Sequence, residues 1–300
     1  MPWCTSEVSN LTNNKTTPLK KLLFFLALVL ATDIALAQKA GKPDRLGMVS
    51  YTFRNSFAKN FTATLDTIKG FGINNIEFSN LFGQTPEKIR AELDARGMHC
   101  TSFGTSYEMA LTKTDEVGRI AKVLGAEFVR VAWIPHTGDF TLEMAEKTIV
   151  DFNTIGSKLR KDFGLTFCYH NHGYEFVNRG NNENLFDLIV QKTNPEDVSF
   201  EMDILWVHIA DVSPAELMKK YPNRFRLMHV KDLKKGVPHG SSGQTDPAND
   251  VTLGTGEIDI PAVLKAAKIS KVKYYYIEDE SPIATQQVPE SIKYVKKLGL

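Results

Sequence analysis

Ionisable side chains stand at the ends of four consecutive short apolar runs in the second half of the chain. They are His170, Asp203, His229 and Glu278. Charged groups are costly beside buried strands unless they are paired or bind a ligand. Taken singly, each is more typical of a helix cap or a hydrogen-bond partner. Two imidazoles and two carboxylates from neighbouring strands together suit a divalent cation (Mn, Zn, Co, Fe or Mg), so we predict a metal site.

Other polar residues follow the same strands at a spacing of two. His172 follows His170, and Lys231 follows His229. Side chains alternate along a strand, so residues two positions apart share a face. If the first member of each pair faces the cation, His172 and Lys231 also lie near it.

Eight apolar runs rich in β-branched and aromatic residues recur along the chain, and most are followed by a segment with helical spacing. We predict strands at residues 46–52, 75–78, 99–103, 128–133, 166–169, 198–202, 226–230 and 274–277. The clearest helical segments are 86–96, 115–124 and 142–161, and glycines stand just past helix ends at Gly72, Gly97, Gly125 and Gly164.

This alternation without hairpin signals predicts a parallel sheet with helical crossovers. Eight units in about 260 residues favour a single closed (β/α)8 TIM barrel. The rival is an open doubly wound sheet, which favours a glycine-rich phosphate loop after its first strand. The residues there are Tyr51-Thr52-Phe53-Arg54-Asn55, which do not form such a loop.

A segment rich in Gly, Ser, Pro, Asp and Asn spans residues 234–251, after the seventh strand. That position lies on the carboxyl-terminal face, where barrel enzymes act. The segment is therefore a candidate lid, with an ordinary surface loop as the alternative.

The N-terminal segment has the pattern of a signal peptide. Lys20 and Lys21 precede an apolar run too short to span a membrane, and Ala35-Leu36-Ala37 forms a small-x-small cleavage site. We predict a leader at residues 1–37 and a barrel domain at 38–300, exported to the periplasm or secreted, with no membrane segment after cleavage. The alternatives are a start downstream of Met1 or an uncleaved anchor.

The charge of the chain bears on its class of partner, and its cysteines bear on whether it has a disulfide. The chain has 36 Lys and Arg against 35 Asp and Glu, and without the leader it is formally neutral. A neutral chain does not favour nucleic acid as a partner. Cys100 and Cys168 lie in apolar runs and are expected to be core residues without a disulfide.

Five short motifs resemble those of the sugar phosphate isomerase/epimerase family, the xylose-isomerase-like barrels. The resemblance runs from Leu46 to the C-terminus. The motifs are Tyr169-His170-Asn171-His172 through Glu175-Phe176, Glu201-Met202-Asp203-Ile204-Leu205-Trp206, His229-Val230-Lys231-Asp232, Gly254-Thr255-Gly256-Glu257-Ile258-Asp259 and Ile277-Glu278.

The resemblance implies metal ligands of type Glu, Asp, His and Glu on strands five to eight. Asp203, His229 and Glu278 match, but His170 stands where the first Glu is expected. In epimerases of the family the two Glu residues also exchange the substrate proton. A histidine bound to metal is a poor base because its lone pair is used. Either His170 or His172 could be the strand-five ligand.

Proton transfer would then fall to Glu278 or to a residue off the metal: His172, Lys231 or Glu175. A nearby cation would lower the pKa of Lys231 and make it a base. The alternative for Lys231 is a salt bridge to Glu201 or Asp203.

Further residues are candidates for substrate contact. Glu175 is one, and Glu77 would bind a substrate hydroxyl or brace His229. Arg130 would bind a phosphate or carboxylate, or pair with Glu77. Trp206, together with Tyr51, Phe53 and Trp133, would form an apolar wall for a sugar ring, unless these side chains belong to the core.

The resemblance implies a small-molecule sugar substrate and a metal-dependent isomerase or epimerase acting through an enediolate. His170 and the predicted export favour the alternative of a lyase or hydrolase acting on an oxidised (keto) glycoside. A non-catalytic sugar-binding barrel is a second alternative. An endonuclease would need a basic groove and more metal ligands, which the neutral chain disfavours.

Overall fold

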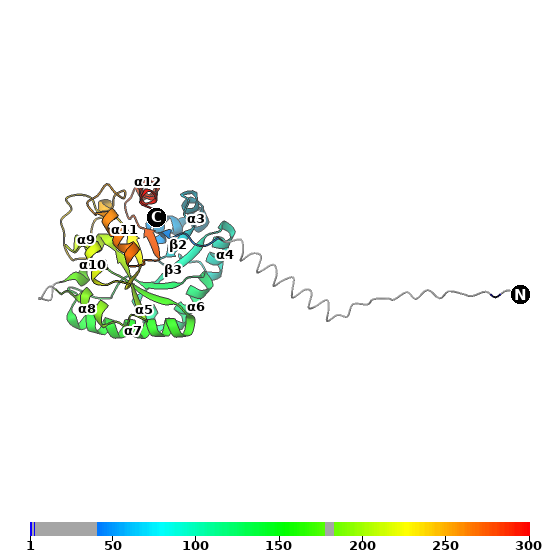
Figure 1. Ribbon diagram of the computed structural model, residues 1–300, viewed down its shortest axis with the longest axis horizontal. Coiled ribbons are helices and arrows are strands. Elements are labelled where there is room, and N and C mark those ends of the chain that lie inside the picture. Colours follow the sequence, from blue (N-terminus) through cyan, green and yellow to red (C-terminus); the bar gives the residue numbers. More distant parts are fainter. Residues whose placement is uncertain (2, 4–40, 178–182) are drawn as a thin grey trace. The chain divides into compact units, whose positions relative to one another are not determined.

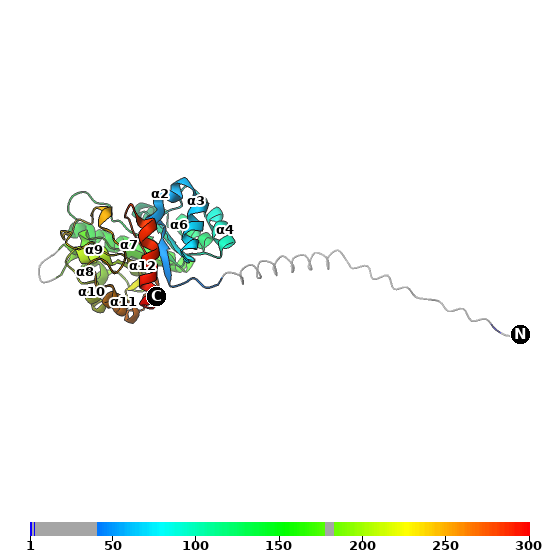
Figure 2. The same ribbon diagram turned by 90° about the horizontal axis from the view of Figure 1, so that it is seen from above.

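The computed structural model describes residues 1, 3, 41–177 and 183–300. Eight parallel strands close into a barrel in sequence order, with β8 pairing with β1. This confirms the predicted (β/α)8 barrel. In Figure 1 the helices surround the sheet, and Figure 2 shows the C-terminal helix α12 beside the first strand. The strands are β1 Leu46–Val49, β2 Asn75–Phe78, β3 His99–Thr105, β4 Phe128–Val131, β5 Thr166–His170, β6 Val198–Asp203, β7 Phe225–Val230 and β8 Tyr274–Ile277.

Helices follow the strands, and short polar residues begin many of them. The α-helices are α2 Arg54–Lys59, α3 Phe61–Gly70, α4 Pro86–Arg96, α5 Tyr107–Thr112, α6 Thr114–Leu124, α7 Leu142–Phe163, α8 Leu185–Lys192, α9 Ile204–Ile209, α10 Pro214–Lys220, α11 Ile260–Ile269 and α12 Ala284–Lys297, and the 3-10 turns are η1 Ser50–Phe53, η2 Tyr174–Phe176 and η3 Pro247–Asn249. Thr85, for example, accepts a hydrogen bond from the Lys88 backbone N–H at the start of α4. Gly97 and Gly164 end α4 and α7 in the left-handed conformation, as predicted.

Several strand ends differ from the prediction. The first strand stops at Val49 because Ser50–Phe53 turn into η1, and the fourth stops at Val131. The fifth and sixth strands extend to His170 and Asp203, so both side chains belong to strand ends. The barrel therefore holds these groups on regular backbone.

The apolar core has two parts. A large cluster fills the space between strands and helices. A small cluster consists of Val49, Phe128, Cys168, Leu227, Tyr274 and Tyr276, which lie at alternate strand positions. We infer that this small cluster fills the barrel interior below the site, because alternate positions share one face of a strand.

Residues 42–300 form one compact unit. Within the described residues, Cys100 and Cys168 are buried and free, as predicted. None of the helices in the described ranges is long and apolar enough to cross a bilayer. The predicted leader at residues 1–37 lies almost wholly outside the described residues, as do positions 38–40 of the predicted domain.

Candidate metal centre

The register of neighbouring strands brings the four predicted ligands together. Asp203 on β6 pairs with His229 on β7, and Glu278 follows the last residue of β8. His229 Nδ1 lies 2.7 Å from Glu278 Oε2 and 3.1 Å from His170 Nε2. Asp203 Oδ2 lies 3.4 Å from His170 Nε2 and 3.9 Å from His229 Nδ1. All four residues are buried, and their ligand atoms lie within 4.8 Å of one another.

This spacing fits a divalent cation. Ligand atoms about 2.1 Å from a tetrahedral metal lie roughly 3.4 Å apart. Asp203 presents one oxygen for this purpose: its Oδ1 accepts hydrogen bonds from the backbone N–H of Leu205 and Trp206 at the start of α9. Among the described residues, its buried Oδ2 has no hydrogen-bond partner. Such an oxygen is costly unless a cation or proton satisfies it.

His229 is oriented by a carboxylate beneath the site. Its Nε2 lies 2.8 Å from Glu77 Oε1, so a proton on Nε2 leaves the Nδ1 lone pair facing the other ligands. Burial lowers the pKa of His229, but the charges of Glu201, Glu278 and Glu77 outweigh burial and raise it well above its usual value. Cation binding at Nδ1 must therefore displace a proton.

Arg130 and two glutamates form a charged layer below His229. Arg130 Nε lies 2.9 Å from Glu77 Oε1, which matches the pairing given as one alternative for Arg130. It lies 3.3 Å from Glu201 Oε2, and both contacts are ion pairs by distance without hydrogen-bond geometry. Burial raises the pKa of Glu77, but the charges of Arg130 and His229 lower it to about 2 overall. Glu77 is fully buried and braces His229, the second of the roles considered for it.

Lys231 lies among four carboxylates. Its ammonium lies 2.9 Å from Glu280, 3.5 Å from Asp250, 3.6 Å from Glu278 and 4.0 Å from Asp203. Burial lowers the pKa of Lys231, but these carboxylates raise it well above its usual value. These four carboxylates oppose the lowering of the pKa that is expected from a nearby cation. The predicted salt bridge to Asp203 is present at the distance limit, and Glu201 is not its partner.

His172 lies at the wall of the cleft and not among the four grouped ligands. Its ring stacks against Trp206 and meets Trp133 edge-on, with centroids 5.6 and 5.3 Å away. Burial is the main cause that lowers the pKa of His172 well below its usual value. The structure thus groups His170 with the other ligands and leaves a neutral imidazole at His172.

Glu175 does not point into the cleft. It is fully buried, accepts a hydrogen bond from the Tyr169 hydroxyl, and accepts 2.9 and 3.1 Å hydrogen bonds from the His172 backbone N–H. Glu175 lies in the turn η2, and its carboxylate contacts the backbone of the strand-five loop at His172. A substrate contact or proton transfer by Glu175 therefore has no support here, and its carboxyl group holds the loop that carries His172.

A cleft of about 680 Å³ opens above the four ligands. Trp206, Trp133 and Tyr51 line it, whereas Phe53 is buried in the outer core beside Phe71, so that part of the predicted wall is wrong. Loop residues from the predicted lid also line it, namely Gly243, Gln244, Thr245, Pro247 and Asp250.

Sequence reasoning missed several polar residues of the cleft. Ser79, Asn80, Glu108 and Glu280 line it. Most follow strand ends, which is the available signal. Asp250 lies in the predicted lid, but its contact with Lys231 was not predicted, because that contact joins two ends of an irregular loop.

Comparison with known proteins places the chain among related barrels. The family model described as xylose isomerase-like TIM barrel matches residues 65–298. A curated relative, inosose dehydratase 2 of Bacillus cereus, is 32% identical over 99 residues, which cover 33% of this chain and 32% of that relative. This likeness therefore spans about a third of the relative's length.

Two solved structures share the fold. A sugar phosphate isomerase/epimerase from Parabacteroides distasonis ATCC 8503 is 21% identical with a TM-score of 0.66, covering 86% of this chain and 95% of that one. The IolI protein with a binding zinc atom is 16% identical with a TM-score of 0.67, covering 85% and 96%. At these identities the likeness establishes the architecture of the barrel.

Proposed function

The chain belongs to the xylose isomerase-like TIM barrel family, and on this premise we propose that it is a divalent-metal-dependent enzyme that enolises a carbonyl sugar. The leading reaction is isomerisation or epimerisation of a keto-sugar through an enediolate. The observation that carries the proposal is the set of four converging ligand atoms, in which Asp203 Oδ2 is buried without a hydrogen-bond partner among the described residues. Zinc in the IolI structure supports zinc as one candidate cation.

His170, Asp203, His229 and Glu278 would hold the cation. When bound, a divalent cation acts as a Lewis acid that polarises the sugar carbonyl and stabilises developing negative charge. Glu278 lines the cleft and is ionised, because burial raises its pKa but the charges of Lys231 and His229 lower it further. We assign it the removal of the proton next to the carbonyl.

His172 is the second proton carrier in this proposal. It lines the cleft, its imidazole is neutral, and its Nδ1 has no hydrogen-bond partner among the described residues. Glu278 and His172 would act on a substrate between them, with the sugar ring against Trp206 and Trp133. Lys231 positions the carboxylates of Glu278 and Asp203 and is not the base.

A lyase acting on an oxidised glycoside is the second candidate. The observation that favours it is His170, which occupies the ligand position where a two-glutamate epimerase would have a second base. Glu278 would then be the one carboxylate base among the ligands that face the cleft. His172 would donate its proton to a departing oxygen in the lyase, instead of to a carbon as in an epimerase. Enolisation is common to both reactions.

Proton exchange in deuterated water tests the proposal. Metal-loaded protein is incubated with keto-sugars and with glycosides oxidised at a ring hydroxyl, and products are followed by NMR. We expect deuterium at the carbon next to the carbonyl, with an epimer or isomer for the first reaction and an unsaturated product for the second. No exchange with any sugar of the panel would contradict enolisation.

Single substitutions test the proton-transfer roles proposed for Glu278 and His172. Glu278→Gln is expected to abolish exchange, and His172→Gln to slow product formation by about 100-fold or more. Glu127→Gln, at the opposite end of the barrel and outside the residues that line the cleft, is the matched control and should keep full activity. Exchange at the original rate in Glu278→Gln would refute its assignment as the base.

We further propose that the leader predicted at residues 1–37 directs export, which favours an unphosphorylated sugar as substrate. Intact-mass measurement of protein secreted by, or released from the periplasm of, a bacterial host should show a chain that begins at Gln38. A full-length chain confined to the cytoplasm would contradict export.

A further inference from the structure

A second group of metal-ligand side chains lies outside the metal centre. His208, on α9, His239, in the loop after β7, and Glu257 place one ligand atom each within 4.8 Å of the others. The group shares no residue with the first, and its members line a different cleft of about 680 Å³. The proposed function makes no use of it.

Two imidazoles meet one carboxylate oxygen in this group. Glu257 Oε1 lies 3.2 Å from His208 Nε2 and 2.9 Å from His239 Nε2. The side chains are 22 to 28% exposed, so an ion from solvent can reach them. Two imidazole nitrogens and one carboxylate oxygen form a ligand set that suits Zn²⁺ and leaves a fourth position for water.

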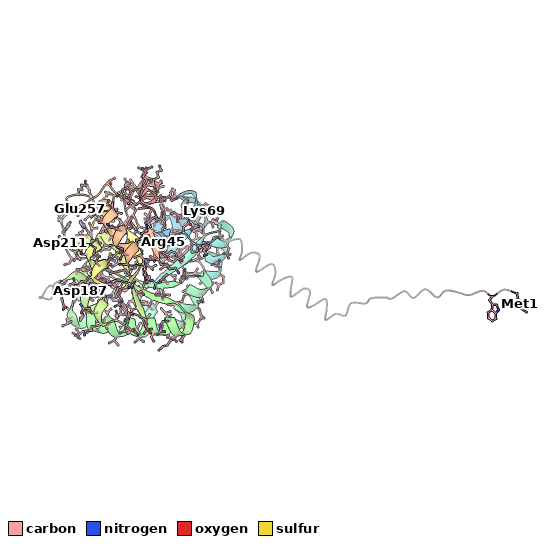
Figure 3. The ribbon with its side chains drawn as sticks, viewed as in Figure 1. Met1, Arg45, Lys69, Asp187, Asp211 and Glu257 are labelled. Carbon is pink, nitrogen blue, oxygen red and sulfur yellow. The ribbon has the colours of Figure 1, made fainter. Side chains whose placement is uncertain are left out.

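Outer contacts orient the ligands. Asp211 Oδ1 lies 2.7 Å from His239 Nδ1, so a proton on Nδ1 leaves the Nε2 lone pair directed at the group. The other oxygen of Glu257 accepts a hydrogen bond from the Gly236 backbone N–H. Figure 3 labels Asp211 and Glu257 on the same side of the barrel, and His239 contacts both.

Glu257 is placed by a rigid loop. The carboxylate of Asp232 accepts hydrogen bonds from the backbone N–H of Gly254, Gly256 and Ile258. The approach is so close that a Cβ on Gly256 would lie 2.2 Å from Asp232 Oδ1. This accounts for the Gly-Thr-Gly-Glu motif, which serves to build the loop that presents Glu257.

We propose that His208, His239 and Glu257 form a second divalent-cation site, of zinc type, that fastens the loop after β7 to helix α9. The Gly240 backbone N–H already donates a 2.7 Å hydrogen bond to the Ile209 carbonyl. Beyond it, Gly243 packs against Gly173 of the strand-five loop, and residues 243–245 line the cleft above the first site. A cation here holds in place the segment that covers the metal centre.

Zinc stoichiometry tests the site independently of activity. Chelator-treated full-length barrel is titrated with zinc by calorimetry, and bound zinc is counted by mass spectrometry. We expect two zinc ions in the wild type, one in His239→Ala, one in Asp203→Asn and none in the double variant. His136→Ala, a histidine outside both groups, should keep two.

The outcomes separate this proposal from the proposed function. If the wild type binds one zinc ion, and this ion is lost in Asp203→Asn but retained in His239→Ala, the second site does not exist. If the one zinc ion is instead lost in His239→Ala and retained in Asp203→Asn, the second site is supported and the metal centre at Asp203 is contradicted. Circular dichroism establishes that each variant is folded.

Hydrogen exchange tests the fastening role. Zinc should slow exchange of the Gly236 and Gly240 amides by about tenfold or more in the wild type and in Asp203→Asn, but not in His239→Ala. Unchanged exchange in zinc-loaded Asp203→Asn would refute the role in holding the loop.

Discussion

At the residue scale, the proposed metal centre depends on the contacts that orient each candidate ligand. Asp203 is fixed by two backbone N–H groups of α9, and His229 by Glu77. These contacts direct Asp203 Oδ2 and His229 Nδ1 toward the proposed cation and disfavour other orientations of the two side chains. Affinity for the cation should therefore depend on residues that do not touch it.

Glu77→Gln tests this dependence. The amide is nearly isosteric, but it removes the charge that holds the proton on His229 Nε2, so cation affinity should fall by about 10- to 100-fold. Competition with a chelator of known affinity measures the change. Glu127→Gln, at the opposite end of the barrel, is the control and should bind as the wild type does. Equal affinity in both variants would show that Glu77 does not act through His229.

The sequence predicted which four residues come together more reliably than it predicted their surroundings. Strand ends carrying His170, Asp203, His229 and Glu278 are visible because polar residues interrupt apolar runs. The partners Asp250 and Glu280 of Lys231 were not predicted, because they are distant in sequence or lie beyond a strand end. The pKa of a buried group depends on such partners, which one-dimensional spacing does not reveal.

At the element scale, strand existence and order followed from periodicity, whereas the turns after the strands did not. The 3-10 turns η1 and η2 remove Phe53 and Glu175 from the cleft. Turns of three or four residues leave no periodic signal, so the predicted first strand ran on into η1. The loop at 234–251 does reach the cleft, in agreement with its predicted place on the catalytic face.

The loop that follows this segment should be intolerant of side chains at one glycine. Gly256→Ala brings a Cβ into Asp232 and the Leu233 carbonyl, at 2.2 and 2.4 Å, and should destabilise the fold by roughly 1–3 kcal/mol. Urea unfolding measures the loss. Gly240→Ala, where a Cβ meets nothing within 4 Å, should change stability by less than about 0.5 kcal/mol. Equal effects in the two variants would contradict the close packing around Asp232.

At the scale of the whole molecule, buried ionisable groups couple folding stability to pH. Burial raises the pKa of Glu175 to about 7, although hydrogen bonds from Tyr169 and the His172 backbone oppose the rise. The folded chain therefore keeps a proton that the unfolded chain loses near pH 4.5. This stabilising contribution is complete below about pH 4.5 and is lost as pH rises toward 7.

Glu175→Gln removes this titration. Between about pH 5 and 8, the free energy of unfolding of the wild type should fall relative to the variant by on the order of 3 kcal/mol. Urea unfolding of both proteins across that range, with chelator present, provides the measurement. A constant difference between them would show that Glu175 titrates normally in the fold.

The proposed chemistry requires that His170, Asp203, His229 and Glu278 hold a divalent cation at the mouth of the barrel. Anomalous X-ray diffraction from zinc-soaked crystals, recorded on both sides of the zinc edge, tests this requirement most directly. We expect an anomalous peak about 2 Å from His170 Nε2, Asp203 Oδ2, His229 Nδ1 and a Glu278 oxygen. An anomalous map without a peak among these four atoms, from crystals with zinc ordered elsewhere, would contradict it.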